Sequence, residues 1–163
     1  INIKLIIILR NPVEKAYSTY SQQLSFNEHT MSFEETVKAE LRRIELSKNY
    51  PELNSNDPDF GNHVMHNLVR HGIYFDYLNE WFKIFPKKQF FIIDSEKLKN
   101  STQDTLDDVF KFLDVQPHKI SNLSKINVGQ YTKIDDSSKK ILTDFYLLHN
   151  EKLYNLLGSR YSW

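Results

Sequence analysis

The sequence predicts an α/β fold with a small parallel sheet flanked by helices. Residues 3–9 and 89–94 form two short, nearly uninterrupted apolar runs, which are typical of strands buried on both faces of a parallel sheet. Apolar residues between and after these runs recur at helical spacing. Strands that alternate with helices favour parallel pairing, and a length of 163 residues suits a single domain.

The first helix is expected directly after the first strand. Asn11 is a good N-terminal cap, and Pro12 suits the first helical position because no N–H is needed there. The apolar positions that follow at helical spacing are Val13, Ala16, Tyr17, Tyr20 and Leu24. A second helix is predicted over residues 31–46, where Ser32 and Glu35 have the spacing of a capping box.

A polar, turn-rich loop is predicted over residues 49–62, before a long amphipathic helix over residues 64–85. Gly72 falls inside that helix, where it costs some stability, and Pro86 closes it. The boundaries predicted for the rest of the chain are a helix from Ser101 or Thr102 to Leu113, a long loop around Gly129, and a last helix from Asp135 or Asp136 to Gly158.

Composition narrows the classes of function. The formal net charge is zero, so no overall positive field favours nucleic acid or an anionic membrane. The absence of cysteine excludes disulfides and thiolate metal sites, and it suits a reducing, cytoplasmic compartment. No apolar run approaches the roughly 20 residues of a membrane span. His63 and His66 lack a third ligand at a suitable spacing, so no metal site is expected.

The junction between the first strand and the first helix is the main candidate for a binding site. In an open parallel sheet, ligands bind beyond the carboxyl ends of the strands, where Arg10 stands. The N–H groups that begin the next helix favour an anion, and Ser18 lies almost two turns beyond Asn11 on the same face. A guanidinium fork and a hydroxyl suit a phosphate. The alternative is a surface Arg10 paired with Glu14, beside a solvated Ser18.

Four segments, in this order, resemble the sulfotransferases that use 3′-phosphoadenosine 5′-phosphosulfate. LIIILRNPVEKAYSTY (residues 5–20) is similar to the family's 3′-phosphate-binding segment, and GIYFDYLNEWFKIFPKKQFFIIDSEKL (residues 72–98) to its helix–strand segment. TLDDVFKFLDV (residues 105–115) resembles the helix that follows. FYLLHNEKLYNLLGSRYSW (residues 145–163) resembles the ending of heparan-sulfate-type and bacterial members. The resemblance implies a P-loop-like sulfotransferase fold over nearly the whole chain.

The resemblance also implies roles for individual residues. Arg10 and Ser18 match the positions that bind the 3′-phosphate. Gly129 aligns with a loop that closes over the nucleotide, although this chain has Val-Gly-Gln where the heparan-type enzymes have Lys-Gly-Arg. Lys133 is the candidate to supply the missing charge. Arg70 is a candidate contact to the nucleotide or the acceptor, and its alternative is a solvated helix arginine.

The implied reaction transfers a sulfuryl group from 3′-phosphoadenosine 5′-phosphosulfate to a hydroxyl or amine of a carbohydrate or small molecule, without a metal. In the family, the 5′-phosphosulfate loop and the usual base lie before these segments, so we expect a single sulfotransferase-like domain over residues 1–163, truncated at its N-terminus. Glu34 is the candidate base within the chain; its alternative is a first-turn glutamate that favours the helix dipole. The oligomeric state is left open.

Two other functions remain open alongside the transferase. One is a non-catalytic nucleotide-binding or interaction domain that keeps only the 3′-phosphate site. The other is a nucleotide-dependent kinase, against which the absence of any glycine-rich phosphate loop counts.

Overall fold

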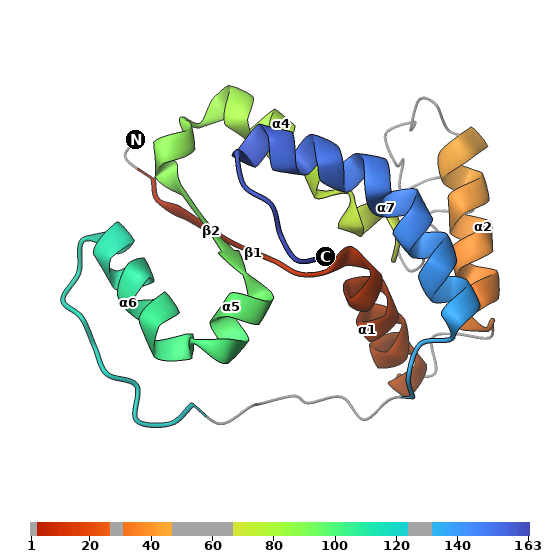
Figure 1. The fold of residues 1–163 in the computed structure, drawn as a ribbon, viewed down its shortest axis with the longest axis horizontal. Helices are drawn as coiled ribbons and strands as arrows, with labels where there is room; N and C mark the ends of the chain where they lie inside the picture. The colour runs from red at the N-terminus through yellow and green to blue at the C-terminus, as the bar shows by residue number, and fades with distance from the viewer. Residues whose placement is uncertain (1–2, 27–30, 47–66, 124–131) are drawn as a thin grey trace.

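The computed structural model describes residues 3–26, 31–46, 67–123 and 132–163. Two short strands, β1 (Leu5–Leu9) and β2 (Phe90–Asp94), pair in parallel at the centre of the molecule (Figure 1). Leu5 lies opposite Phe90 and Leu9 opposite Asp94, so both strands end at the same edge of the sheet. The predicted α/β class with a small parallel sheet is therefore confirmed.

Helices make up most of the remaining described chain. The α-helices are α1 (Pro12–Ser25), α2 (Phe33–Leu46), α4 (Tyr74–Ile84), α5 (Ser95–Asn100), α6 (Thr102–Leu113) and α7 (Asp136–Leu157), and the short 3-10 turns are η1 (Arg70–Gly72) and η2 (Lys87–Gln89). α5 and α6 lie on one side of the strand pair, and α4 and α7 lie on the other (Figure 1). None of the helices in the described residues is long and apolar enough to cross a membrane.

Two apolar clusters hold these layers together, and α7 takes part in both. The first cluster joins α1, α2, η1 and α7, with Ala16, Val37, Val69 and Leu142 all fully buried. The second cluster joins β1, α4 and α7 through Leu9, Leu78 and Leu153. The carboxyl end of β1 and the beginning of α1 therefore lie between two well-packed regions.

The helix caps that were predicted from single residues are confirmed. The Asn11 side chain accepts a hydrogen bond from the N–H of Val13, and Pro12 is the first residue of α1. The Ser32 and Glu35 side chains each accept from the backbone N–H of the other, which completes the capping box. Asp135 caps α7, and Gly158 ends it with a positive φ of 70°.

The continuous helix predicted up to residue 85 is wrong in its described part. The chain makes the turn η1, Ile73 leaves helical geometry with a ψ of 68°, and α4 begins only at Tyr74. The interruption directly follows Gly72. A Cβ at this position would lie 2.8 Å from Cζ of Tyr146 and 2.9 Å from Cβ of Pro12, so the chain bends where two other elements approach it.

Two further expectations need correction. β1 is not buried on both faces within the described structure, because Ile6 and Ile8 are 41% and 54% exposed. The helix α5, which begins directly after β2, was not predicted. The Asp94 side chain caps it by accepting from the N–H of Glu96 at 2.9 Å. The loop predicted over residues 49–62, as well as His63, His66 and Gly129, lies outside the described residues.

Candidate functional site

Arg10 follows β1 at the edge of the sheet where the strands end. Its backbone carbonyl accepts a hydrogen bond from the Tyr74 hydroxyl at 2.9 Å. Burial of Tyr74 raises the pKa of its hydroxyl to about 12, so the donor stays protonated at neutral pH. The bond joins the strand end to the first residue of α4, which fixes the position from which the Arg10 side chain extends.

The first N–H groups of α1, which were expected to be available to an anion, are bonded to Asn11. Oδ1 of Asn11 accepts from the N–H of Val13 at 3.0 Å and of Glu14 at 3.5 Å, and the Asn11 carbonyl accepts from Lys15. Pro12 has no N–H to offer. An anion at this junction would therefore be held mainly by side chains, with the helix dipole as a weaker contribution.

The Arg10 side chain pairs with a carboxylate in the first turn of α1. Its guanidinium lies 3.6 Å from Oε2 of Glu14, one turn into the helix, and both side chains are largely solvent-accessible. Ser18 lies one turn beyond Glu14 along the same stripe of α1 and is half-buried. The structure thus contains the Arg10–Glu14 pair that was the alternative to a phosphate site. Glu14 and Ser18 are four residues apart, so the hydroxyl that the phosphate site requires lies on the same face of α1 as the partner of Arg10.

A second group of cationic side chains lies where η1 packs against α1. The pKa of His71 is lowered by burial, and the positive charges of Lys15 and Arg70 lower it further. Burial also lowers the pKa of Lys15, and the carboxylate of Glu40 partly offsets this effect. Arg70, which was a candidate from its sequence position, therefore stands beside the first turns of α1 and not within a continuous solvated helix.

Glu40 of α2 is the most deeply buried carboxylate of this region, with an exposed fraction of 1%. Its two oxygens accept hydrogen bonds from the backbone N–H of Val69 at 2.9 Å and of Arg70 at 2.8 Å. Burial raises the pKa of Glu40 to about 7, although these hydrogen bonds favour its ionised form. The side chain thus connects α2 to the turn that carries Arg70.

Lys133 belongs to the segment that leads into α7, and this segment contacts α1. The hydroxyls of Thr132 and Tyr17 form a hydrogen bond of 2.9 Å that joins positions 115 residues apart. Tyr17 precedes Ser18 in α1, so the bond brings the exposed Lys133 to the helix that carries the candidate phosphate ligand. Gly129 lies outside the described residues.

Glu34, the candidate base, lies in the first turn of α2. Oε1 accepts from Nζ of Lys38 at 2.6 Å, and the Ser137 hydroxyl lies 3.5 Å from the same oxygen. These contacts suit the structural alternative, in which Glu34 stabilises the beginning of the helix.

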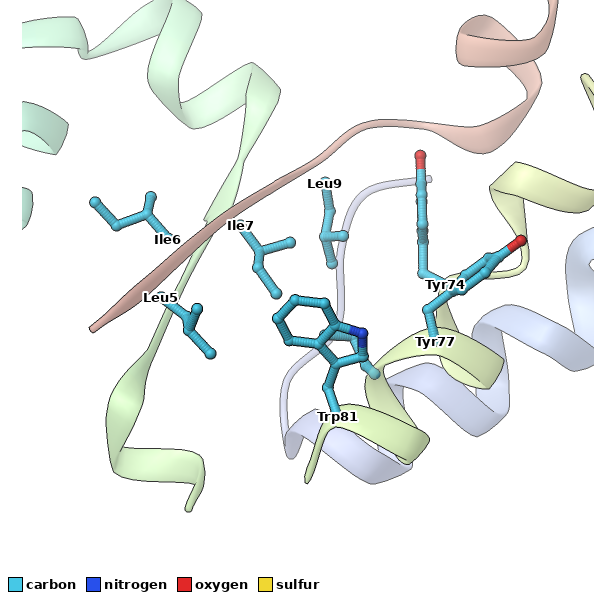
Figure 2. A pocket seen from close by; sticks show the side chains of 8 residues that line it. Leu5, Ile6, Ile7, Leu9, Tyr74, Tyr77 and Trp81 are labelled. Carbon is cyan, nitrogen blue, oxygen red and sulfur yellow. The ribbon is translucent and has the colours of Figure 1, made fainter. Parts of the chain in front are cut away.

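A separate apolar pocket of about 370 Å³ lies between β1 and α4 (Figure 2). The side chains that line it are Leu5, Ile6, Ile7, Leu9, Tyr74, Tyr77, Leu78 and Trp81. Figure 2 shows Leu5, Ile7 and Leu9 on the strand facing Trp81 and the two tyrosines on α4. None of these side chains carries a charge, so the pocket does not suit a phosphate. Within the described residues, no group of three or more histidine or acidic side chains could hold a metal ion.

The sequence analysis did not identify Lys15, Glu40 and His71, which lie in the region where η1 packs against α1. One signal was present for Glu40, because it falls on the apolar stripe of α2 with Phe33, Val37 and Ile44. A charged residue on an apolar helix face is informative, since a buried carboxylate needs partners. Lys15 and His71 carry no comparable signal.

Comparisons with known proteins agree with this fold. A model of the sulfotransferase domain family matches residues 1–154. Human carbohydrate sulfotransferase 15 is 29% identical over 175 residues, which cover 99% of this chain and 31% of that protein. Heparan sulfate glucosamine 3-O-sulfotransferase 5 of Mus musculus is 26% identical over 185 residues, with 99% of this chain and 49% of that protein covered.

One solved structure supports the architecture directly. A crystal structure of a sulfotransferase from Alicyclobacillus acidocaldarius superposes with a TM-score of 0.75 and 22% identity, over 98% of this chain and 56% of that chain. The chain spans less than half the length of the curated relatives described above.

Proposed function

Because the chain belongs to the sulfotransferase domain family, we propose that it contributes the 3′-phosphate-binding part of an enzyme that uses 3′-phosphoadenosine 5′-phosphosulfate. The reaction would transfer the sulfuryl group to a hydroxyl or amine of an acceptor. One observation carries the proposal: the Arg10 guanidinium pairs with Glu14 in the first turn of α1, and Ser18 lies one turn further along the same face, in a segment that resembles the family's 3′-phosphate-binding segment.

The donor set of this region suits a phosphate. Arg10 supplies a planar fork of N–H donors that can bind two phosphate oxygens, and Ser18 adds a hydroxyl donor. Lys133 supplies a further positive charge from the segment that Thr132 joins to α1. Arg70 and Lys15 add positive potential beside the first turns of the same helix. These groups would bind and orient the donor nucleotide through its 3′-phosphate.

Sulfuryl transfer depends on such orientation. By analogy with phosphoryl transfer, the attacking and leaving oxygens lie in line with the transferred group, and catalysis relies on positioning and on stabilisation of developing charge. Binding energy gained at the remote 3′-phosphate can align the transferred group. Glu34 remains a proposed base, and its contacts with Lys38 and Ser137 favour a structural role instead.

A carbohydrate is the acceptor class that we propose. Both mammalian relatives described above are named as sulfotransferases of carbohydrate or heparan sulfate, which is a property of those proteins. For this chain, a sugar hydroxyl or amine is the corresponding proposal. The test is to supply the sulfuryl donor together with heparosan, chondroitin and simple phenols as competing acceptors, and to measure which of them becomes sulfated.

The nucleotide proposal is tested by calorimetry with 3′-phosphoadenosine 5′-phosphate and 5′-AMP. We expect the 3′-phosphate to improve affinity at least tenfold, or about 1.4 kcal/mol, and Arg10→Ala and Ser18→Ala to remove most of that gain. The control variants are Arg42→Ala on α2 and Ser25→Ala near the end of α1, which are both exposed. Equal affinity for the two nucleotides would overturn the proposal.

A further inference from the structure

The turn η1 is held by one buried carboxylate from a different helix. Glu40 lies on α2, and both of its oxygens accept backbone N–H groups from Val69 and Arg70. Hydrogen bonds from two adjacent donors to one carboxylate fix both the position and the direction of that peptide. With an exposed fraction of 1%, the carboxylate is too deeply buried to touch a ligand itself.

The same turn is held from its other side by α7. The Tyr146 hydroxyl donates to the Val69 carbonyl at 2.6 Å, so Val69 is bonded through both its N–H and its carbonyl. Gly72 fits so closely between Tyr146 and Pro12 that a Cβ would meet both. The turn therefore has little freedom to move relative to the first residues of α1.

Among the described residues, three ionisable groups interact electrostatically with Glu40. Arg43 of α2 lowers the pKa of Glu40, and the Glu40 carboxylate acts to raise the pKa of Lys15 of α1 and of the Tyr146 hydroxyl of α7. Arg70 follows Val69 in the peptide that Glu40 holds, and its charge lowers the pKa of His71 next to it. Glu40 thus holds the turn that carries Arg70 and His71, and this turn packs against α1.

We propose that Glu40 is a positioning residue for the nucleotide site, acting through the Arg70 backbone to hold the turn that carries Arg70 against α1. The inference rests on the proposed function, because it assumes that Arg70 contributes to nucleotide binding. It assigns a binding role to a side chain that never meets the ligand. It also explains why a carboxylate occupies the apolar face of α2.

The variant Glu40→Gln tests this role with little change of shape. The amide keeps one oxygen acceptor but directs N–H donors at one of the two backbone N–H groups, which leaves that group without a partner. The turn should shift and carry Arg70 with it. Glu45→Gln, an exposed change on the same helix, is the matched control.

A double-mutant cycle separates positioning from general stability. We would measure the affinity of the full-length protein for 3′-phosphoadenosine 5′-phosphate in wild type, Glu40→Gln, Arg70→Ala and the double variant, at a temperature where each is folded by circular dichroism. When Arg70 is present, we expect Glu40→Gln to weaken nucleotide binding about tenfold. When Arg70 is replaced by alanine, the same change should weaken binding less than about twofold. Glu45→Gln should leave the affinity unchanged.

Several results would overturn the assignment. Equal losses in both backgrounds would make Glu40 a general structural residue, and an unchanged affinity in Glu40→Gln or in Arg70→Ala would remove the link between the two. Failure of the proposed function is seen separately, in wild type alone, as equal affinity for 3′-phosphoadenosine 5′-phosphate and 5′-AMP. In that case, the positioning role falls with it.

Discussion

The Tyr74 hydroxyl donates a hydrogen bond of 2.9 Å to the backbone carbonyl of Arg10, across 64 positions of the chain. This bond joins the first residue of α4 to the residue that directly follows β1. The backbone of the candidate phosphate-binding arginine is therefore held by α4, a helix near the other end of the crossover between the two strands.

Tyr74→Phe should reduce both stability and nucleotide affinity. Loss of the donor leaves the partly buried Arg10 carbonyl without this partner, which should cost about 1 kcal/mol in the free energy of unfolding measured with urea. Tyr20→Phe is the matched control, since its hydroxyl donates to the Met31 carbonyl at the same 2.9 Å, away from the strand end. We expect Tyr20→Phe to lower stability alone; a similar loss of affinity in both variants would contradict the prediction.

Glu14→Gln should strengthen nucleotide binding. The carboxylate pairs with Arg10 at 3.6 Å, so it competes with a phosphate for the same guanidinium. Exposed pairs of this kind contribute about 1 kcal/mol or less, so we expect an increase of a few-fold in affinity for 3′-phosphoadenosine 5′-phosphate. The gain should diminish as salt concentration rises.

The control for this change is Glu80→Gln, which breaks a comparable exposed pair with Lys83 on α4. That variant should bind the nucleotide as wild type does. A weaker affinity in Glu14→Gln would instead mean that the pair orients Arg10 for the phosphate.

Gly72→Ala should disturb η1 and, with it, nucleotide binding. The new Cβ would lie 2.8 Å from Cζ of Tyr146 and 2.9 Å from Cβ of Pro12, so one of these elements must move. Overpacking of this kind costs about 1–3 kcal/mol, measurable by urea unfolding. Gly158→Ala is a useful comparison, because its φ of 70° strains an alanine while nothing lies within 4 Å of the new atom. Only Gly72→Ala should lose affinity.

The stability of the protein should depend on pH through Glu40. Burial raises the pKa of this carboxyl from an ordinary 4.5 to about 7. The folded state therefore binds the proton more tightly than the unfolded state, so the stabilising contribution is complete below pH 4.5 and is lost as the pH rises through 7.

Urea unfolding of wild type and Glu40→Gln between pH 4.5 and pH 8 measures this effect. The stability of wild type relative to the variant should fall by on the order of 3 kcal/mol across that range and then level off. His71 titrates in both proteins, so its contribution cancels in the difference. A difference that does not change with pH would contradict the raised pKa.

Local patterns predicted the strands and most helix ends correctly. The apolar runs became β1 and β2, and the Asn11, Ser32 and Asp135 caps formed as expected, because each depends on residues within one turn of the chain. The junction of β1 and α1 was also predicted as a candidate site. The two expectations for this junction conflict, because the predicted Asn11 cap takes up N–H groups that the predicted anion site would also need.

The errors come from contacts between distant parts of the chain. The expected helix is interrupted at Ile73, directly after Gly72, where Tyr146 and Pro12 of two other elements leave no room for a side chain. Glu40 was overlooked because its partner Val69 lies 29 positions further along. β1 was expected to be covered on both faces, yet Ile6 and Ile8 are exposed in the described structure. Helical and strand periodicity contains no information on these two contacts or on which face of a short strand stays exposed.

The parallel pairing of β1 with β2 has a consequence for how this protein folds. In the described residues, the chain leaves the sheet at Leu9 and returns at Phe90, so α1, α2, η1 and α4 lie between the two paired strands. Closing a long loop adds little to the equilibrium cost, since each doubling of its length costs only about 0.6 kcal/mol. The long crossover does lower the folding rate, because sheet contacts between residues far apart in the sequence form late. We therefore expect refolding in milliseconds to seconds, with α7 and the helices of the crossover acquiring amide protection before the strands.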